Sequence, residues 1–370
     1  MRKDRVLLVD DEQNLLRTAS RVLAPRYEVA IAATPHEALA AVAEAAPDLA
    51  ILDIRMPEMD GFQLMTALRE RAPDVEIIFM TGLVHEVDAQ LIRAIREKAF
   101  YFITKPFDRE VLLALVGRCL ELRRLGRENE RYTRKLEGQL EEARLFQSSM
   151  LPAADAVVGG TALAAAYHPC DALGGDLYDF AAAGDARVAF VVADVSGHGV
   201  SAAMLTGIVK SAFHDAHTED FAPDAVTRRV AGALRPFDEG RFVTLFCGRF
   251  DGRTLEYANA GHPPPLLGAS GASPRRLALT GTMISPAFSD LTWDVETTEI
   301  GPSERLLVYT DGVVETRGEE GLFGEDRLVE TFRATNDTGR ALLDGLVGAT
   351  RAFAAGRPVD DDLTMLTLGG

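Results

Sequence analysis

The sequence predicts an α/β domain with a five-stranded, doubly wound parallel sheet, then a coiled-coil helical linker, then an α+β sandwich of two antiparallel sheets flanked by helices. Apolar strand-like runs alternate with helical patterns up to about residue 120, and such alternation is typical of a parallel sheet with helices on both faces. Beyond residue 150 the strand and helix patterns come in blocks, which favours antiparallel sheets. The predicted boundaries are 1–120 for the first domain, 121–150 for the linker and 151–370 for the second domain.

Four apolar runs of the first domain each end in polar residues. They are 5–9 before Asp10 and Asp11, 49–52 before Asp53, 77–80 before Thr81, and 101–104 before Lys105. A helical pattern at 37–43 lies between the first two runs. Ligands bind such sheets at the carboxyl ends of the strands. We therefore expect these polar side chains to meet at one site.

This order of residues resembles the receiver domain of response regulators over about residues 1–120. The resemblance implies that a sensor histidine kinase phosphorylates Asp53. The implied ligands of one Mg²⁺ are Asp10, Asp11, Asp53 and the backbone carbonyl of Arg55. Lys105 would pair with the phosphoryl charge, Thr81 would contact it through its hydroxyl, and Phe102 would be the switch aromatic. A carboxylate attacks a phosphoryl donor only where a cation and an ammonium group offset the crowded negative charge.

The linker carries apolar residues at a 3-4 spacing, with mostly charged residues between them. The seam positions are Leu115, Arg118, Leu122, Leu125, Asn129, Tyr132, Leu136, Gln139, Ala143, Phe146 and Met150. This heptad repeat favours a two-stranded coiled coil, and therefore a homodimer. The alternative is a single amphipathic helix that lies against its own domains. Gly126 and Gly138 weaken the helix by about 1 kcal/mol each relative to alanine, and we expect such a weak coil to carry a signal between the domains.

Four aspartate clusters lie along the last two thirds of the chain. They are Gly174-Gly175-Asp176, Ala193-Asp194-Val195-Ser196-Gly197-His198-Gly199, Thr310-Asp311-Gly312 and Asp360-Asp361-Asp362-Leu363-Thr364. Each aspartate alone is also explained as a turn former or a helix cap. If the carboxylates meet at one place, they would hold divalent cations through oxygen, and two such cations would activate a water against a phosphate ester.

As a set, these clusters resemble the PPM-type serine/threonine phosphatases, in particular the bacterial SpoIIE/RsbU branch, over roughly residues 145–370. The segments 147–152 and 259–265 match that branch as well. The resemblance implies that the catalytic Asp176 bridges two Mn²⁺ or Mg²⁺ ions, that Asp194 and the backbone carbonyl of Val195 bind one of them, and that Asp311 and Asp361 bind the other. Outside the metal ligands, Asp179 and Asp362 are expected to be second-layer or surface groups, and His198 and His262 to shape loops.

The second domain contains regular elements around these clusters. The predicted strands are 162–168, 188–193, 242–250, 254–258, 305–309 and 363–368, and the predicted helices are 199–217, 224–234, 325–335 and 341–354.

The composition of the chain indicates which classes of partner and which cellular compartment are expected. The net charge of −17 argues against nucleic acid or an anionic membrane as a partner, because a basic patch is their usual footprint. No apolar run approaches the length of a membrane span. The three cysteines show no paired spacing, which indicates reduced thiols in a cytoplasmic protein.

These observations predict a response regulator whose output is a metal-dependent protein serine/threonine phosphatase. The resemblance points to a phosphorylated STAS-domain anti-sigma-factor antagonist as the substrate, in a partner-switching pathway. The alternative is a catalytically inactive phosphatase-fold adaptor that binds a regulatory protein under the control of receiver phosphorylation. All four metal-binding aspartates are present in the sequence, which favours the enzyme.

Overall fold

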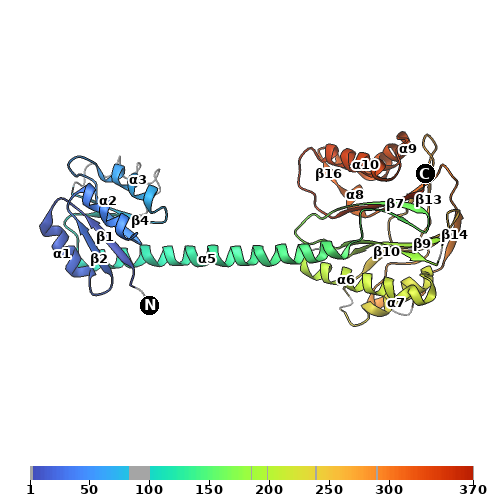
Figure 1. The fold of residues 1–370 in the computed structure, drawn as a ribbon, viewed down its shortest axis with the longest axis horizontal. Helices are drawn as coiled ribbons and strands as arrows, with labels where there is room; N and C mark the ends of the chain where they lie inside the picture. Colours follow the sequence, from blue (N-terminus) through green and yellow to red (C-terminus); the bar gives the residue numbers. More distant parts are fainter. Residues whose placement is uncertain are drawn as a thin grey trace. The chain divides into compact units, whose positions relative to one another are not determined.

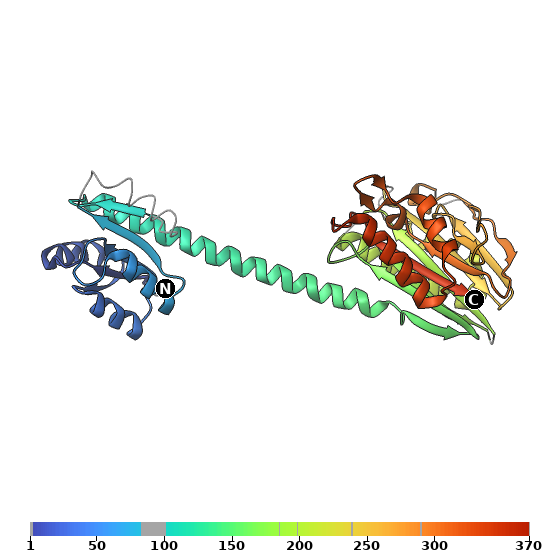
Figure 2. The same cartoon turned by 90° about the horizontal axis from the view of Figure 1, so that it is seen from above.

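The computed structural model describes residues 3–82, 101–184, 186–197, 199–237, 240–288 and 291–369. The chain divides into two compact units, Met1–Leu136 and Glu137–Gly370, which are drawn in Figures 1 and 2. His198, to which the sequence assigned a loop-shaping role, lies outside the described residues.

The first unit contains the predicted five-stranded parallel sheet, which is confirmed. Its strands are β1 (Arg5–Val9), β2 (Glu28–Ala32), β3 (Leu49–Asp53), β4 (Glu76–Thr81) and β5 (Tyr101–Thr104). Their order is β2-β1-β3-β4-β5 and all four pairings are parallel. The apolar runs are buried because both faces of the sheet are covered. The polar residues that follow β1, β3, β4 and β5 therefore lie along one edge of the sheet.

Helices cover both faces of this sheet. They are α1 (Gln13–Leu23), α2 (Pro35–Glu44), α3 (Gly61–Arg71) and α5 (Arg109–Met150). The side chains of α1 and of the first turns of α5 form one buried cluster, and those of α2 and α3 form the other. Asp60 begins α3 with a capping box, in which its side chain accepts from the Gln63 N–H and the Gln63 side chain accepts from the Asp60 N–H. This cap fixes where α3 starts, close after the phosphoacceptor candidate Asp53.

The predicted linker helix is confirmed, because α5 is one uninterrupted helix of 42 residues (Figure 2). Its first turns pack on the sheet of the first unit, where Leu112 and Val116 are fully buried. In its middle the predicted seam is open, and Tyr132 and Leu136 are 58% and 60% exposed. The pairing of two such helices in a coiled coil stays a prediction.

The second unit is a sandwich of two antiparallel sheets, as predicted. One sheet has the order β14-β11-β10-β9-β8 and the other β13-β12-β15-β18-β7-β6. The strands are β6 (Asp155–Val158), β7 (Thr161–His168), β8 (Asp176–Ala183), β9 (Arg187–Val195), β10 (Val243–Phe250), β11 (Thr254–Ala260), β12 (Leu266–Gly268), β13 (Arg275–Arg276), β14 (Glu296–Glu299), β15 (Arg305–Tyr309) and β18 (Leu363–Gly369), and a separate small hairpin joins β16 (Arg317–Gly318) to β17 (Gly321–Leu322). A buried apolar cluster fills the space between the two large sheets.

Helices flank the sandwich on both sides (Figure 1). They are α6 (Val200–Asp215), α7 (Pro223–Leu234), α8 (Asp311–Glu315), α9 (Gly324–Ala334) and α10 (Gly339–Ala354). The first two pack on the sheet that contains β8 to β11, and α10 packs on β7 and β18 of the other sheet. The four longer helices agree with the predicted ones within a few residues at each end.

Strand β8 is the main element that the sequence did not predict. Its aspartates, Asp176 and Asp179, interrupt the apolar pattern on which strand prediction depends. Both are buried nevertheless, at 3% and 2% exposure. Asp176 is also the first residue of β8, whereas strand-end acids were expected to follow an apolar strand.

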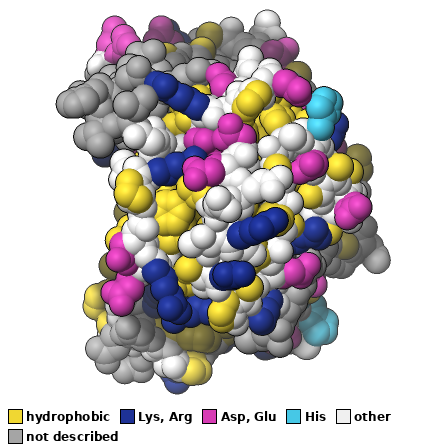
Figure 3. Space-filling model, turned by 90° about the vertical axis from the view of Figure 1, so that its left-hand side faces the viewer, with side chains coloured by type: hydrophobic (Ala, Val, Ile, Leu, Met, Phe, Trp, Pro, Cys, Tyr) yellow, Lys and Arg dark blue, Asp and Glu magenta, His cyan; other side chains and the backbone are white. Residues whose placement is uncertain are grey.

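The surface carries charges of both signs. On the face drawn in Figure 3, described Lys and Arg side chains lie among Asp, Glu and apolar side chains. Among the described residues, no helix is long and apolar enough to cross a membrane.

Candidate functional site

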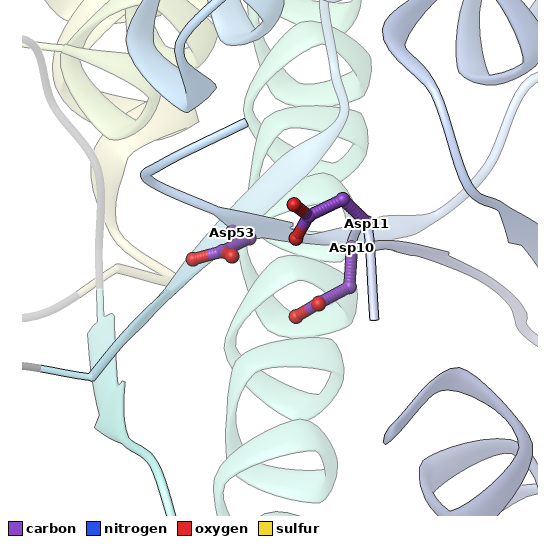
Figure 4. Close-up of side chains that lie close together, drawn as sticks. All are labelled: Asp10, Asp11 and Asp53. Carbon is purple, nitrogen blue, oxygen red and sulfur yellow. The ribbon is translucent and has the colours of Figure 1, made fainter. Parts of the chain in front are cut away.

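The first candidate site lies at the carboxyl ends of β1 and β3, which are neighbours in the sheet. One carboxylate oxygen from each of Asp10, Asp11 and Asp53 lies within 4.8 Å of the other two. Figure 4 shows the three side chains close together. Asp10 is fully buried, Asp53 is 7% exposed and Asp11 is exposed. Three hard oxygen donors that converge in this way fit the ligand preference of Mg²⁺.

Lys105 brings a positive charge to the same site. Its Nζ lies 2.5 Å from Oδ2 of Asp10 and 2.8 Å from Oδ2 of Asp53. Burial raises the pKa of Asp53, although the nearby ammonium group opposes that rise. Burial works against the charged form of Lys105, but its bonds to the two carboxylates outweigh this effect and raise its pKa. The lysine is thus held charged where a phosphoryl group on Asp53 would add negative charge.

The other predicted receiver residues surround this cluster. The Lys105 backbone N–H donates to the Thr81 carbonyl at 2.7 Å, so the ends of β4 and β5 meet beside the acids, and Thr81 itself is 7% exposed. Phe102 is half-buried, with its ring centroid 5.7 Å from that of Phe79. The Arg55 N–H donates to Oδ1 of Asp53 at 3.4 Å, so the chain turns back over the carboxylate.

Gly61 shapes this turn, and the sequence analysis missed it. Its N–H donates to the Ile54 carbonyl at 3.0 Å. A Cβ at this position would lie 2.4 Å from the backbone oxygen of Asp53. Only glycine allows α3 to begin so close to the end of β3.

The second candidate site begins with two acids on neighbouring strands. Asp176, at the start of β8, is the cross-strand partner of Asp194, near the end of β9. Because antiparallel strands run in opposite directions, the two carboxylates lie at the same end of the sheet. The hydroxyl of Thr310, which follows β15 in the opposite sheet, donates to Oδ2 of Asp176 at 2.8 Å. Asp311, the first residue of α8, comes directly after it.

Two glycines allow the loop before Asp176 to pack tightly. The Val195 N–H donates to the Gly175 carbonyl at 3.0 Å. A Cβ on Gly175 would lie 2.8 Å from the Val195 carbonyl oxygen, which is a predicted metal ligand. A Cβ on Gly174 would lie 2.4 Å from the hydroxyl oxygen of Tyr167. Glycine is therefore favoured at both positions, because Tyr167 approaches the backbone of Gly174 and Val195 approaches the backbone of Gly175.

Asp362 binds the backbone of the same Gly174–Asp176 loop through its carboxylate and is not a surface group. It is 4% exposed. Its carboxylate accepts from the N–H groups of Gly175 at 2.5 Å, of Asp176 at 3.3 Å and of Cys170 at 2.8 Å. Its neighbour Asp361 is exposed, and one of its side-chain oxygens accepts from the Asp362 N–H at 2.8 Å.

The electrostatics of these acids favour a bound cation. Burial and the charge of Asp194 raise the pKa of Asp176 well above its ordinary value. Burial and the charges of Asp311, Asp361 and Asp362 raise the pKa of Asp194 to about 7. Mutual repulsion of this kind is relieved by a divalent ion bound through oxygen. Among the described residues, however, no three of the four predicted aspartate ligands come as close together as the three receiver acids do.

Two further polar residues have structural partners. Asp179 lies under α6, where its carboxylate pairs with Lys210 and lies 2.8 Å from Nε2 of His214. His262 is 1% exposed, and its Nδ1 lies 3.0 Å from the hydroxyl oxygen of Thr244. Burial lowers the pKa of His262 to about 3, so the ring is neutral at physiological pH.

The fold and the two acidic sites together define a class, namely a receiver domain joined by a helix to a phosphatase-type sandwich. The family model of stage II sporulation protein E (SpoIIE) matches residues 184–369, and that of the response regulator receiver domain matches residues 6–117. The chain belongs to the SpoIIE family and carries a response-regulator receiver domain. It is thus a response regulator with a PPM-type phosphatase domain as its output.

Known proteins match each part of the chain. Protein IcfG of Synechocystis sp. is 29% identical over 261 residues, which cover 62% of this chain and 41% of IcfG. Regulatory protein AtoC of Escherichia coli is 36% identical over 126 residues, which cover 34% of this chain and 27% of AtoC. The chain thus spans less than half the length of either relative.

A solved structure matches the second unit. The SiaA-PP2C domain of Pseudomonas aeruginosa aligns with a TM-score of 0.57 and 21% identity, covering 65% of this chain and 98% of that domain. At this identity the likeness shows that the two proteins share the PP2C fold.

Proposed function

We propose that this chain hydrolyses phosphoserine or phosphothreonine in a protein substrate and that receiver phosphorylation controls the rate. The observation that carries the proposal is the cross-strand pair of Asp176, which is 3% exposed, and Asp194, which is partly buried. Burial and neighbouring carboxylates raise the pKa values of both. Such a pair is costly to fold unless a cation compensates for it.

The proposed metal ligands follow from this pair. Asp176 would hold both of two Mn²⁺ or Mg²⁺ ions, Asp194 and the Val195 carbonyl would hold one of them, and Asp311 and Asp361 would hold the other. When bound, such ions lower the pKa of a water held between them and offset charge on the phosphoryl oxygens. The chain's own contribution is orientation, because Thr310 and Asp362 hold the side chain and backbone of Asp176.

In the receiver, Asp53 accepts a phosphoryl group from a sensor histidine kinase. Asp10, Asp11 and the Arg55 carbonyl complete a Mg²⁺ site with it, Lys105 offsets the new charge, Thr81 contacts the phosphoryl oxygen and Phe102 responds to that contact. The convergence of three acids and one lysine within the site supports these roles.

The proposed substrate is a phosphorylated STAS-domain anti-sigma-factor antagonist, and membership in the SpoIIE family supports it. The test is release of phosphate from this phosphoprotein, and from a phosphoserine peptide, by the purified chain in excess Mn²⁺ and in a chelator. We expect turnover with Mn²⁺ and loss of turnover, on the order of a thousandfold or more, with the chelator. A folded chain that binds the phosphoprotein but releases no phosphate in Mn²⁺ would instead be the adaptor.

The proposal includes a homodimer paired through α5. The apolar stripe in the middle of the helix supports it, since Leu125, Tyr132 and Leu136 are 49%, 58% and 60% exposed in the single chain. Large apolar side chains repeated at heptad spacing on a charged helix are typical of a coiled-coil seam.

Replacing Leu136 by glutamate should weaken this dimer at least about tenfold, because the change buries a charge in the seam. Sedimentation equilibrium would measure the dissociation constant. The matched control is Leu145→Glu, since Leu145 lies on the same helix, is 57% exposed and is not a seam position. Equal effects of the two changes, or a wild-type chain that is monomeric throughout, would contradict pairing through the predicted seam.

A further inference from the structure

Gln147, in the last turn of α5, is a buried amide with an unusual set of partners. It is 7% exposed. Its Nε2 donates to the Gly174 carbonyl at 2.7 Å, and its Oε1 accepts from the Gly174 N–H at 3.2 Å. A third contact, from Nε2 to the Thr206 hydroxyl of α6, measures 3.4 Å. The side chain thus pairs with both backbone groups of one residue, as a neighbouring strand would.

Gly174 lies two residues before Asp176, and the loop between them has two main supports. Gln147 holds Gly174 from one side, while the Asp362 carboxylate holds the N–H groups of Gly175 and Asp176 from the other. These bonds are buried, so a lost partner leaves a polar group without water to replace it. The position of Asp176 therefore depends on a side chain that the linker helix supplies.

The same turn of α5 also contacts α6. Met150 packs against Gly207, where a Cβ would lie 3.7 Å from the Met150 sulfur. Helix α6 begins a few residues after Asp194 and Val195, the candidate ligands on the neighbouring strand. The end of α5 thus contacts the loop before Asp176, and it also contacts α6, the helix that follows Asp194 and Val195.

We infer that Gln147 is a positioning residue, through which the last turn of α5 sets the metal affinity of the phosphatase site by holding the Gly174–Asp176 loop. The inference rests on the proposed function. When the last turn of α5 is packed against the loop, both Gln147 and Asp362 bind the loop, and Asp176 is held in position to bind metal. When that turn shifts or unwinds, Gly174 loses both of its bonds and the affinity falls. A change in the helix can in this way reach the metal site without any new contact.

The test compares Gln147→Met and Gln147→Glu with Gln139→Met in the full chain. Methionine keeps the volume but has no amide, and ionised glutamate keeps an acceptor for the Gly174 N–H but cannot donate to the Gly174 carbonyl. Gln139→Met makes the same change at an exposed position of the same helix, so it reports effects that act through helix pairing alone. Calorimetric Mn²⁺ titration measures binding directly, and the Asp176→Asn chain supplies the contribution of the receiver.

Both Gln147 variants should bind Mn²⁺ at the phosphatase site about tenfold more weakly, the usual cost of removing a group that orients a metal ligand. Turnover at saturating Mn²⁺ should stay within about twofold of the wild type, because the ligands themselves are unchanged. A merely structural role would lower the unfolding temperature and leave the Mn²⁺ affinity unchanged, and that result would overturn the inference. If the wild type binds Mn²⁺ but releases no phosphate, the proposed function fails while the affinity comparison still decides the role of Gln147.

Discussion

Replacing Asp176 by asparagine should lower phosphatase turnover on the order of a thousandfold, while the chain stays folded. A bridging carboxylate holds both ions, and ions of this kind contribute several kcal/mol of transition-state stabilisation, which corresponds to a factor of about a thousand. Asparagine has nearly the same size, and its amide oxygen is able to accept the bond from the Thr310 hydroxyl. It also removes a buried charge that faces Asp194, whose repulsion helps to raise the pKa of Asp176. The metal-free variant should therefore unfold at the same temperature as the wild type or higher.

The measurement is turnover of a phosphoprotein in excess Mn²⁺, with circular dichroism to follow unfolding. The control is Asp360→Asn, which makes the same change in the acidic triplet before β18. Its side chain is 65% exposed and pairs with Arg317 at 3.2 Å, so turnover should not change. Near-normal turnover in a folded Asp176→Asn chain would refute the two-metal assignment.

Replacing Asp53 by asparagine should abolish phosphorylation of the receiver by acetyl phosphate and Mg²⁺. An amide oxygen carries no charge with which to attack the phosphorus atom, whereas the Asp53 carboxylate has Lys105 at 2.8 Å to offset the growing charge. Mass spectrometry of the intact chain, followed by peptide mapping, would locate the label. We expect one labelled site in the wild type and none in the variant.

A matched change tests whether this loss is specific. Asp74→Asn alters an acid of the same unit that is 75% exposed and pairs with Arg127 on α5, so that chain should be labelled like the wild type. Label that persists in the Asp53→Asn chain, for example on Asp10 beside the same lysine, would mean that the acceptor has been assigned to the wrong residue.

Most of the receiver site was predictable from sequence because its acids, Thr81 and Lys105 follow apolar runs along the chain. Asp10, Asp53 and Thr81 stand at the carboxyl ends of strands that alternation with helices predicts to be parallel. Their convergence is therefore a consequence of local pattern. Gly61 carries no such signal, since the close approach that requires glycine depends on where α3 meets the end of β3.

The phosphatase site was less predictable because its residues are stabilised by partners far away in the sequence. Strand β8 was missed since the buried Asp176 is compensated by Thr310, and Asp179 by Lys210 and His214. The spacing of apolar residues along the chain does not reveal contacts between residues that are far apart in the sequence. The role that we infer for Gln147 was missed for the same reason, although its place at the start of the matching segment 147–152 was one signal that pointed to it.

The continuity of α5 restricts how the length of this protein can change. Each inserted residue turns the rest of an α-helix by about 100° and moves it about 1.5 Å along the axis. A single insertion in the open middle of the helix would therefore put the seam positions before it and the seam positions after it on different sides of the helix. An insertion of seven residues changes the rotational phase by only about 20°. If α5 pairs through this seam, the length of the linker among functional relatives of this architecture should accordingly vary in steps close to whole heptads.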